Sequence, residues 1–275
     1  MVRRRFHAPP DAFAPDGATV VLARGEAQHL LGVLRLKPGD EAFVFDGEGN
    51  EYACVVAAAD AATAGGRRAA AAATATLEVR GRVAPQRPES PLDLTLAVAL
   101  LKGEKFDLVV QKATELGVSR IVPVETKRAD VRLGQQAGEG REAATARVAR
   151  WTRLALEAAK QCGRARLPEV CAPVAFAALV AGGAGGSGGD VVEEQRLFFT
   201  ERDGRGLAET VARWPARPAK LTALVGAEGG WDDEEIALAA GAGWHAVTFG
   251  GRVLRAETAA VVVTGLLQHL YGDLI

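Results

Sequence analysis

Apolar and polar positions follow different patterns in the two parts of the chain. Before residue 85 the apolar segments are short, such as ATVVLA and EAFVFDG, and turn-forming residues separate them, as in the stretch 37–40. Residues 26–36 instead show the leucine spacing of a helix. From Leu92 onward the apolar segments become continuous, which is typical of parallel strands buried on both faces. The pattern predicts a small β-rich domain followed by an α/β domain.

The boundary between these domains is marked by prolines. Between residues 85 and 91 they alternate with charged residues, a composition that favours an exposed connection. We therefore assign residues 1–84 to the β-rich domain and residues 85–275 to the α/β domain. In the second domain the strand LDLTLAVALL, the amphipathic helix FDLVVQKATELGV and the strand RIVPVET form a βαβ unit. A long helix is predicted next, ending near Gly163.

Two low-complexity stretches carry no chemistry that we can assign. Residues 57–75 are rich in alanine. The stretch Gly182 to Gly189 has the glycine content of a dinucleotide-binding loop, but no strand precedes it and no apolar helix follows it. We predict that it is a flexible surface linker.

The last fifty residues contain the same pattern twice. LTALVGAEGGWDDEEIALAA and HAVTFGGRVLRAETAAVVVTGLLQHLYGD each run from an apolar strand through a glycine-bearing turn into a helix. Asp232 and Glu235 have the spacing of a capping box at the start of the first helix. Ligands bind in such turns, at the carboxyl ends of parallel strands, because backbone N–H groups are free there. The final helix is too apolar for a surface helix, which predicts packing against the sheet or another subunit.

Composition narrows the protein class only slightly. With 48% apolar and 24% charged residues the chain has the composition of a globular protein, and no segment approaches the roughly 20 apolar residues of a membrane helix. The basic cluster at residues 3–5 is not followed by the apolar core of an export signal, so we expect a cytoplasmic protein. Three cysteines without metal-ligand spacing predict neither a disulfide framework nor a metal site. Because the net charge is −1, any contact with RNA must come from local basic patches.

Several long motifs in this order resemble one known family. They are LVGAEGGWDDEEI, FGGRVLRAETAA, KGEKFDLVVQKATELGVSRIVPV, EAAKQCGRARLPEV, and the N-terminal RRFHAP with HLLGVLRLKPGDEAFVFDGEG. Together they resemble the RsmE family of ribosomal small-subunit RNA (uridine-N3) methyltransferases, in the SPOUT superfamily. The resemblance covers nearly the whole chain. Ala227 and Gly251 stand where the family usually has proline, which changes the rigidity of the two turns and not their freedom in φ.

The resemblance implies both a fold and an activity. It implies a PUA-like RNA-binding β-barrel in residues 1–84 and a SPOUT methyltransferase domain in residues 85–275. That domain would have a parallel sheet with helices on both faces and a C-terminal trefoil knot. The implied activity is the S-adenosylmethionine-dependent methylation of N3 of one uridine in small-subunit (16S) ribosomal RNA, by a homodimer. A protein of the same fold that binds RNA without catalysis is the alternative. An oxidoreductase is disfavoured because no G-x-G-x-x-G turn follows the first strand of the α/β domain.

The resemblance and the turn pattern together predict the cofactor-binding residues. They lie at three strand ends: Thr200 at the first, then Gly226, Glu228, Gly229 and Gly230, and then Phe249, Gly250, Arg252, Val253 and Leu254. Glycines in turns often serve only the backbone conformation, and Trp231 is expected to pack against the helix rather than to stack on the cofactor.

The chemistry of the reaction suggests the catalytic residues. N3 of uridine becomes nucleophilic only as its proton leaves, so the site needs a base or a cation that stabilises the anion. We expect Arg255 or Arg252 to stabilise the anion, and Glu257 or Glu228 to accept the proton or to orient its acceptor. The alternative is that both carboxylates cap helix N-termini, where the helix dipole favours a negative charge.

Basic residues at the N-terminus, in the predicted helix at residues 26–36 and in the turn at residues 102–105 are candidates for RNA contacts, because arginine and lysine bind phosphate. A solvated basic face is the alternative for each of them. The expected partner is ribosomal RNA or the small subunit, and neither DNA nor a membrane is expected. The candidates are Arg3, Arg4, Arg5, Arg35, Lys102 and Lys105.

Overall fold

The computed structural model describes residues 3–60, 74–129, 139–182 and 194–274. These residues form two compact units. One unit holds the described residues up to Glu89 together with Ala159–Leu167, and the other holds Ser90–Ala158 and the chain from Pro168 onward. The sequence placed the boundary after residue 84 and did not predict that the segment Ala159–Leu167 joins the N-terminal unit. Most of the alanine-rich stretch, residues 61–73, and residues 183–189 of the predicted linker lie outside the described residues.

A five-stranded sheet forms the N-terminal unit, in the order β1-β3-β4-β5-β2. The β1–β3 pair is parallel and the other pairs are antiparallel. Alternate side chains, including Phe6, Val44 and Leu77, point into one core. The predicted strands ATVVLA and EAFVFDG are β2 and β3. The bounds are β1 Arg5–His7, β2 Thr19–Leu22, β3 Glu41–Phe45, β4 Glu51–Asp60 and β5 Thr74–Val83, with a short 3₁₀ helix η1 at Pro10–Ala12.

The helix predicted over residues 26–36 is wrong in its extent and form. The structure has a short α1 (Arg24–Gln28) followed by a π-helical turn, η2 (His29–Val33). The wider turn buries Leu30 completely but leaves Val33 69% exposed. The leucines and valine of this stretch therefore do not form the single inward face that the spacing predicted.

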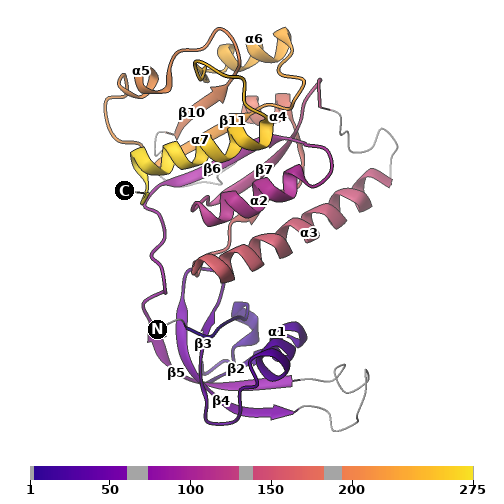
Figure 1. Cartoon of the computed structure of the whole chain (residues 1–275), viewed down its shortest axis with the longest axis vertical. Helices are drawn as coiled ribbons and strands as arrows, with labels where there is room; N and C mark the ends of the chain where they lie inside the picture. Colours follow the sequence, from indigo (N-terminus) through magenta and orange to yellow (C-terminus); the bar gives the residue numbers. More distant parts are fainter. Residues whose placement is uncertain (1–2, 61–73, 130–138, 183–193, 275) are drawn as a thin grey trace. The chain divides into compact units, whose positions relative to one another are not determined.

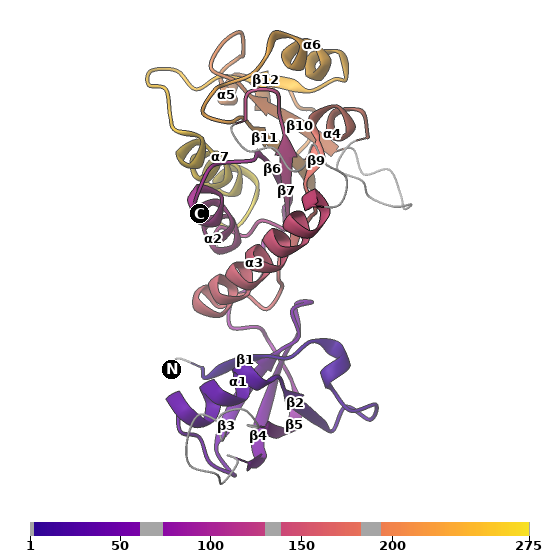
Figure 2. The same ribbon diagram turned by 90° about the vertical axis from the view of Figure 1, so that its right-hand side faces the viewer.

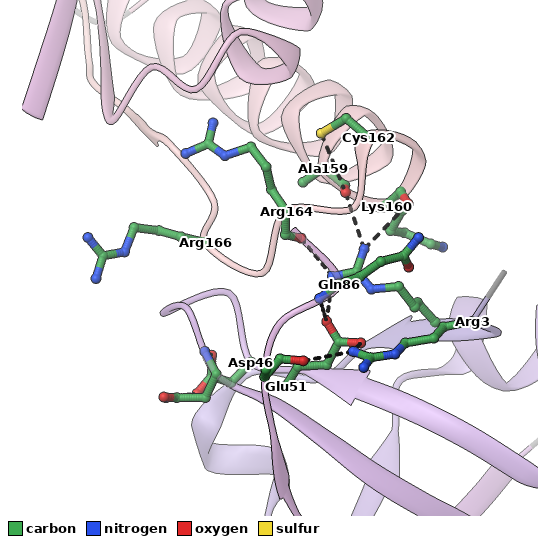
Figure 3. Close-up of polar contacts among 12 residues, drawn as sticks. Arg3, Asp46, Glu51, Gln86, Ala159, Lys160, Cys162, Arg164 and Arg166 are labelled. Atoms are coloured by element: carbon green, nitrogen blue, oxygen red, sulfur yellow. Dashed lines mark hydrogen bonds and ion pairs between the residues drawn. The ribbon is translucent and has the colours of Figure 1, made fainter. Parts of the chain in front are cut away.

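A buried ion-pair network attaches the segment Ala159–Leu167 to the N-terminal unit (Figure 3). The carboxylate of Glu51 is fully buried and contacts Arg3 Nη1 at 2.9 Å and Arg5 Nη2 at 3.2 Å. Arg5 also donates to the carbonyl oxygen of Arg164 at 2.8 Å, just beyond the last turn of a helix. Arg164 in turn pairs with Glu89 at 2.8 Å. The fully buried carboxylate of Glu51 thus has two cationic partners, which offset the cost of removing its charge from water.

The second unit contains one fully parallel sheet in the order β12-β10-β11-β6-β7-β8, with β9 also pairing with β7. Its central strands are apolar on both faces, as the continuous runs predicted: Leu96 and Val98 of β6 enter one core and Ala97 enters the other. The bounds are β6 Asp93–Ala99, β7 Arg120–Glu125, β8 Glu169–Val170, β9 Val174–Ala175, β10 Glu194–Phe199, β11 Lys220–Val225 and β12 His245–Val247.

Helices cover both faces of this sheet (Figures 1 and 2). α2 (Lys105–Glu115) and α7 (Ala256–Tyr271) pack together over one face, and α4 (Phe176–Gly182) and α6 (Asp233–Gly241) lie over the other. α3 (Glu139–Cys162) packs Trp151 onto Phe106 of α2, with ring centroids 4.4 Å apart. α5 (Leu207–Val211) lies beside β12. The expected architecture, a β-rich unit and a parallel sheet between helices, is confirmed.

Within the described residues, no helix is long and apolar enough to cross a membrane. The described His, Cys, Asp and Glu side chains form no cluster that could hold a metal ion. The three cysteines, all among the described residues, form no disulfide, and burial raises the pKa of Cys54 to about 11. This thiol therefore remains protonated at neutral pH.

Candidate active site

Three neighbouring strands end at the same edge of the parallel sheet. β10 lies between β12 and β11, and Phe199, Val225 and Val247 are in register at their carboxyl ends. The turns that follow these strands therefore meet, and together they line one cavity of about 350 Å³. This volume is typical of a small-molecule site. The prediction that the glycine turns lie side by side is confirmed.

The first turn, Gly226–Trp231, is shaped by close packing. The indole of Trp231 lies against Gly226 so tightly that a Cβ atom there would be 2.9 Å from Cε2, and Nε1 donates to the carbonyl oxygen of Phe199 at 2.8 Å. Gly230 has a φ of +66°, and a Cβ atom there would be 2.7 Å from Oε1 of Glu201. Glycine is required at Gly226 for reasons of space, because the buried indole cannot move aside, and at Gly230 for its left-handed conformation.

The helix after this turn begins as predicted. Asp232 accepts a hydrogen bond from the backbone N–H of Glu234 at 3.2 Å, and its own N–H donates to Glu235 at 3.1 Å, which completes the capping box. The cap of α6 is therefore Asp232. Glu228 does not have that role.

The second turn, Thr248–Leu254, is anchored where it begins. The N–H of Gly204 donates to Oγ1 of Thr248 at 3.0 Å, and the N–H of Thr248 donates to the carbonyl oxygen of Arg205 at 2.9 Å. Phe249 packs on Phe199 with ring centroids 5.3 Å apart. Farther along, the turn opens to solvent, and Val253 is 84% exposed.

Most of the predicted cofactor-binding residues line the cavity. Gly229 and Gly230 do not line it: Gly229 packs against the backbone of Arg128, and Gly230 against Glu201. The cavity is lined by Thr200, Gly226, Glu228, Phe249, Gly250, Arg252, Val253 and Leu254 among the predicted residues. The sequence analysis missed Phe199, Glu201, Val225, Ala227, Val247, Thr248, Gly251, Ala256 and Ala259. It assigned Trp231 to packing; the side chain does pack, and it also lines the cavity.

A cation from a distant part of the chain pairs with a residue that lines this cavity. Lys105, the first residue of α2, places Nζ 2.6 Å from Oε1 of Glu228. This hydrogen bond raises the pKa of Lys105. Burial alone would raise the pKa of Glu228, but the hydrogen bonds from Lys105 and from its own backbone N–H lower it overall. Both groups are therefore charged at neutral pH.

The other catalytic candidates have different surroundings. Glu257 is the second residue of α7, and its Oε2 is buried without a hydrogen-bond partner among the described residues. Arg255 precedes this helix and is exposed, and Arg252 lines the cavity and is also exposed. Arg255 and Glu257 do not line the cavity. The negative charge of Glu257 raises the pKa of Lys105, and the positive charge of Arg255 lowers it.

Some of the predicted RNA-binding residues are exposed and others are buried or paired. Arg5 is only 7% exposed and its guanidinium is committed to Glu51 and the Arg164 carbonyl, so we withdraw it as an RNA contact. Arg3 shares this network but remains partly exposed (Figure 3). Lys105 is partly exposed and pairs with Glu228. The residues exposed as expected are Arg4, Arg35 and Lys102.

The fold and the site define a class: a two-unit protein with a β-rich N-terminal part and an α/β part whose strand ends form a ligand cavity. The family model described as "RNA methyltransferase domain" matches residues 88–268, and the model "RNA methyltransferase PUA domain" matches residues 22–63. The chain belongs to the family of ribosomal RNA small subunit methyltransferase E. The resemblance seen in the motifs is confirmed.

Individual relatives support this assignment along most of the chain. Ribosomal RNA small subunit methyltransferase E from Synechocystis is 32% identical over 92% of this chain and 74% of its own length. The protein of the same name from Mycobacterium tuberculosis is 31% identical over 98% of this chain and 93% of its own. The solved structure of the Neisseria gonorrhoeae enzyme, bound to S-adenosylmethionine, has a TM-score of 0.79, is 28% identical and covers 100% of both chains.

The residues present fit S-adenosylmethionine. The cavity combines apolar walls from Phe199, Val225 and Leu254 with glycine turns whose backbone a ligand could approach closely. The carboxylates of Glu201 and Glu228 also line it, and they suit a ligand that carries positive charge.

Proposed function

We propose that this chain methylates N3 of a uridine in small-subunit ribosomal RNA, using S-adenosylmethionine. The observation that carries the proposal is the single cavity formed by the turns after β10, β11 and β12. We also expect the activity in the cytoplasm, with rRNA or the assembled small subunit as substrate. The trefoil knot implied by the resemblance stays a prediction.

The reaction needs little covalent chemistry from the protein. When bound, the cofactor supplies an electrophilic methyl group on a sulfonium. The protein has to hold N3 in line with that methyl group and remove the N3 proton. The turns Gly226–Trp231 and Thr248–Leu254 are proposed to hold the cofactor, mostly through backbone groups.

We assign the base role to Glu257 in preference to Glu228. A carboxylate that already pairs with a cation is a weak base, and Glu228 has such a partner in Lys105. Glu257 instead has a buried oxygen that lacks a donor within the described residues. Because Glu257 does not line the cavity, the N3–H group of uridine would supply this donor only after the exposed turn before α7 shifts. Arg252 and Arg255 are proposed to face the RNA near this point.

RNA is proposed to contact each unit through exposed cations. In the N-terminal unit these are Arg4, Arg35 and the exposed part of Arg3, and in the second unit Lys102. Arg35 adopts an unusual left-handed backbone conformation, with φ at 54°. Changing Arg4 and Arg35 together to Ala should weaken RNA binding and flatten its dependence on salt.

We propose that a second copy of this chain packs on α7. Val262, Leu266 and Leu270 are 36%, 38% and 40% exposed and lie one turn apart along one face of this helix. Leu108 of the adjacent helix α2 is 42% exposed. Val253, at the rim of the cavity, is the most exposed of the large apolar residues described, so a partner there would also complete the cavity wall.

The experiment is a methyl-transfer assay with the full chain. Small subunits purified from cells that lack the gene are incubated with the protein and with S-adenosylmethionine carrying an isotopically labelled methyl group, and the RNA is digested to nucleosides. The proposal predicts labelled N3-methyluridine, which disappears when Glu257→Gln replaces the wild-type protein. Label in a different nucleoside would contradict the proposed acceptor atom. A protein that does not bind the cofactor in calorimetric titration would contradict the proposed function itself.

A further inference from the structure

Lys105 has a position that its local sequence does not explain. It opens α2, and the next residue, Phe106, is buried and packs on Trp151, so the backbone at the helix start is fixed. From there the side chain reaches Glu228, which lies 123 positions away in sequence in the first glycine turn. The contact places the Lys105 ammonium next to a residue that lines the cavity, although Lys105 itself does not line it.

The ion pair with Glu228 orients Lys105 more than it stabilises the fold. The two side chains are 39% and 33% exposed, and solvent screening makes such pairs weak contributors to stability. A lysine ammonium has three donor hydrogens, and within the described part of the chain Glu228 is the acceptor that contacts it. The remaining donor hydrogens of Lys105 are available to an acceptor atom of the substrate.

The other cations near the cavity are not held in this way. Arg252 and Arg255 are exposed, and no hydrogen bond to a described residue fixes either guanidinium. Stabilisation of a developing anion is strongest when the donor is already in place before the reaction. Lys105 meets this condition through its hydrogen bond to Glu228.

We propose that Lys105 is a catalytic residue: its ammonium, oriented by Glu228, binds one of the two uracil carbonyl oxygens beside N3 and stabilises the negative charge that develops there. This inference rests on the proposed function. In the step itself, the Glu257 carboxylate takes the N3 proton, and the N3 electron pair forms the bond to the methyl carbon. The carbon–sulfur bond breaks, and its electron pair stays on sulfur. Glu257 later releases the proton to solvent.

The role assigned to Lys105 makes a specific chemical prediction. If the ammonium stabilises the uracil anion, its loss should matter less for a base whose N3 proton is more acidic. 5-Fluorouridine is such a base, because fluorine withdraws electrons from the ring. The test therefore compares small subunits reconstituted with transcribed rRNA that contains either uridine or 5-fluorouridine.

Lys105→Met is expected to lower the single-turnover rate on the uridine RNA about a hundredfold, the typical effect of removing one anion-stabilising donor. On the 5-fluorouridine RNA the loss should be several-fold smaller. Lys105→Arg should restore most of the rate on both RNAs. Lys112→Met is the matched control, because Lys112 is on the same helix and pairs with Glu115 instead of a cavity residue. It should behave as wild type.

A binding measurement gives a readout that does not depend on turnover. Without cofactor, the wild-type protein should bind the 5-fluorouridine particle more tightly as pH rises and the base ionises, and Lys105→Met should lose this dependence. Equal rate losses on both RNAs, or an unchanged pH dependence of binding, would overturn the inference and leave Lys105 a structural residue. Failure of the wild-type protein to bind S-adenosylmethionine or to methylate the uridine particle would overturn the proposed function instead.

Discussion

Gly226 tests whether close packing in the first turn shapes the cavity. A Cβ atom at this position would lie 2.9 Å from Cε2 and 3.0 Å from Nε1 of Trp231. Carbon contacts are normally about 3.5–4.0 Å. The indole cannot easily retreat, because it is only 2% exposed and its Nε1 donates to the Phe199 carbonyl oxygen at 2.8 Å. Gly226→Ala must therefore shift either the turn or the tryptophan.

The size of the effect follows from this overlap. Adding a methyl group to a well-packed site costs about 1–3 kcal/mol, and we expect the free energy of unfolding to fall by that amount. Trp231 also lines the cavity, so its displacement changes the shape that the cofactor meets. We expect the affinity for S-adenosylmethionine to fall about tenfold, which corresponds to about 1.4 kcal/mol.

Urea denaturation followed by circular dichroism measures the first quantity, and calorimetric titration measures the second. Gly241→Ala is the matched control: Gly241 is the last residue of α6, and a Cβ atom there would meet nothing within 4 Å. Its expected effect is at most a gain of about 1 kcal/mol in stability, with unchanged affinity. If Gly226→Ala behaved like this control, the close packing of Trp231 on the turn would not be what shapes the site.

Further predictions concern both units. Arg5→Met should lower the free energy of unfolding by about 3 kcal/mol, since it removes one partner of the buried Glu51, whereas Arg4→Ala should change it by no more than about 0.5 kcal/mol; equal denaturation midpoints would contradict the buried network. Glu257→Gln should reduce methyl transfer about a hundredfold while cofactor affinity, measured by calorimetry, stays the same; a parallel loss of affinity would remove its role as base. Leu266→Asp should convert a dimer to a monomer in light scattering, and an unchanged mass would rule out α7 as the interface. Cys54, whose pKa burial raises to about 11, should resist alkylation by iodoacetamide in the native protein at pH 8, and rapid modification would contradict its buried position.

Much of the fold could be predicted because its signals are local. Continuous apolar segments predicted the parallel strands, and the strand–glycine–helix pattern placed the turns at Gly226 and Gly250 at one edge of the sheet. The capping box at Asp232 needed only a three-residue spacing. The helix predicted over residues 26–36 failed because apolar spacing does not distinguish an α-helical turn from the wider π-helical turn that follows Gln28.

The missed features depend on contacts between distant segments. Glu201 and Thr248 reach the cavity because the loop after β10 returns along β12 and is fixed there by the contact between Gly204 and Thr248. The sequence around Arg5 does not distinguish it from a solvent-exposed arginine. Its burial depends on Glu51 and on the end of α3. No local pattern near these residues indicates their partners.

We propose that the turns after β10, β11 and β12 form the site of a uridine-N3 methyltransferase that acts on ribosomal RNA. The most direct test is mass-spectrometric mapping of small-subunit rRNA from cells with and without this gene, the latter complemented with either the wild-type gene or Glu257→Gln. We predict N3-methyluridine at one position that is lost on deletion, returns with the wild-type gene and does not return with the variant. An unchanged set of methylated uridines in the deletion strain would contradict the account.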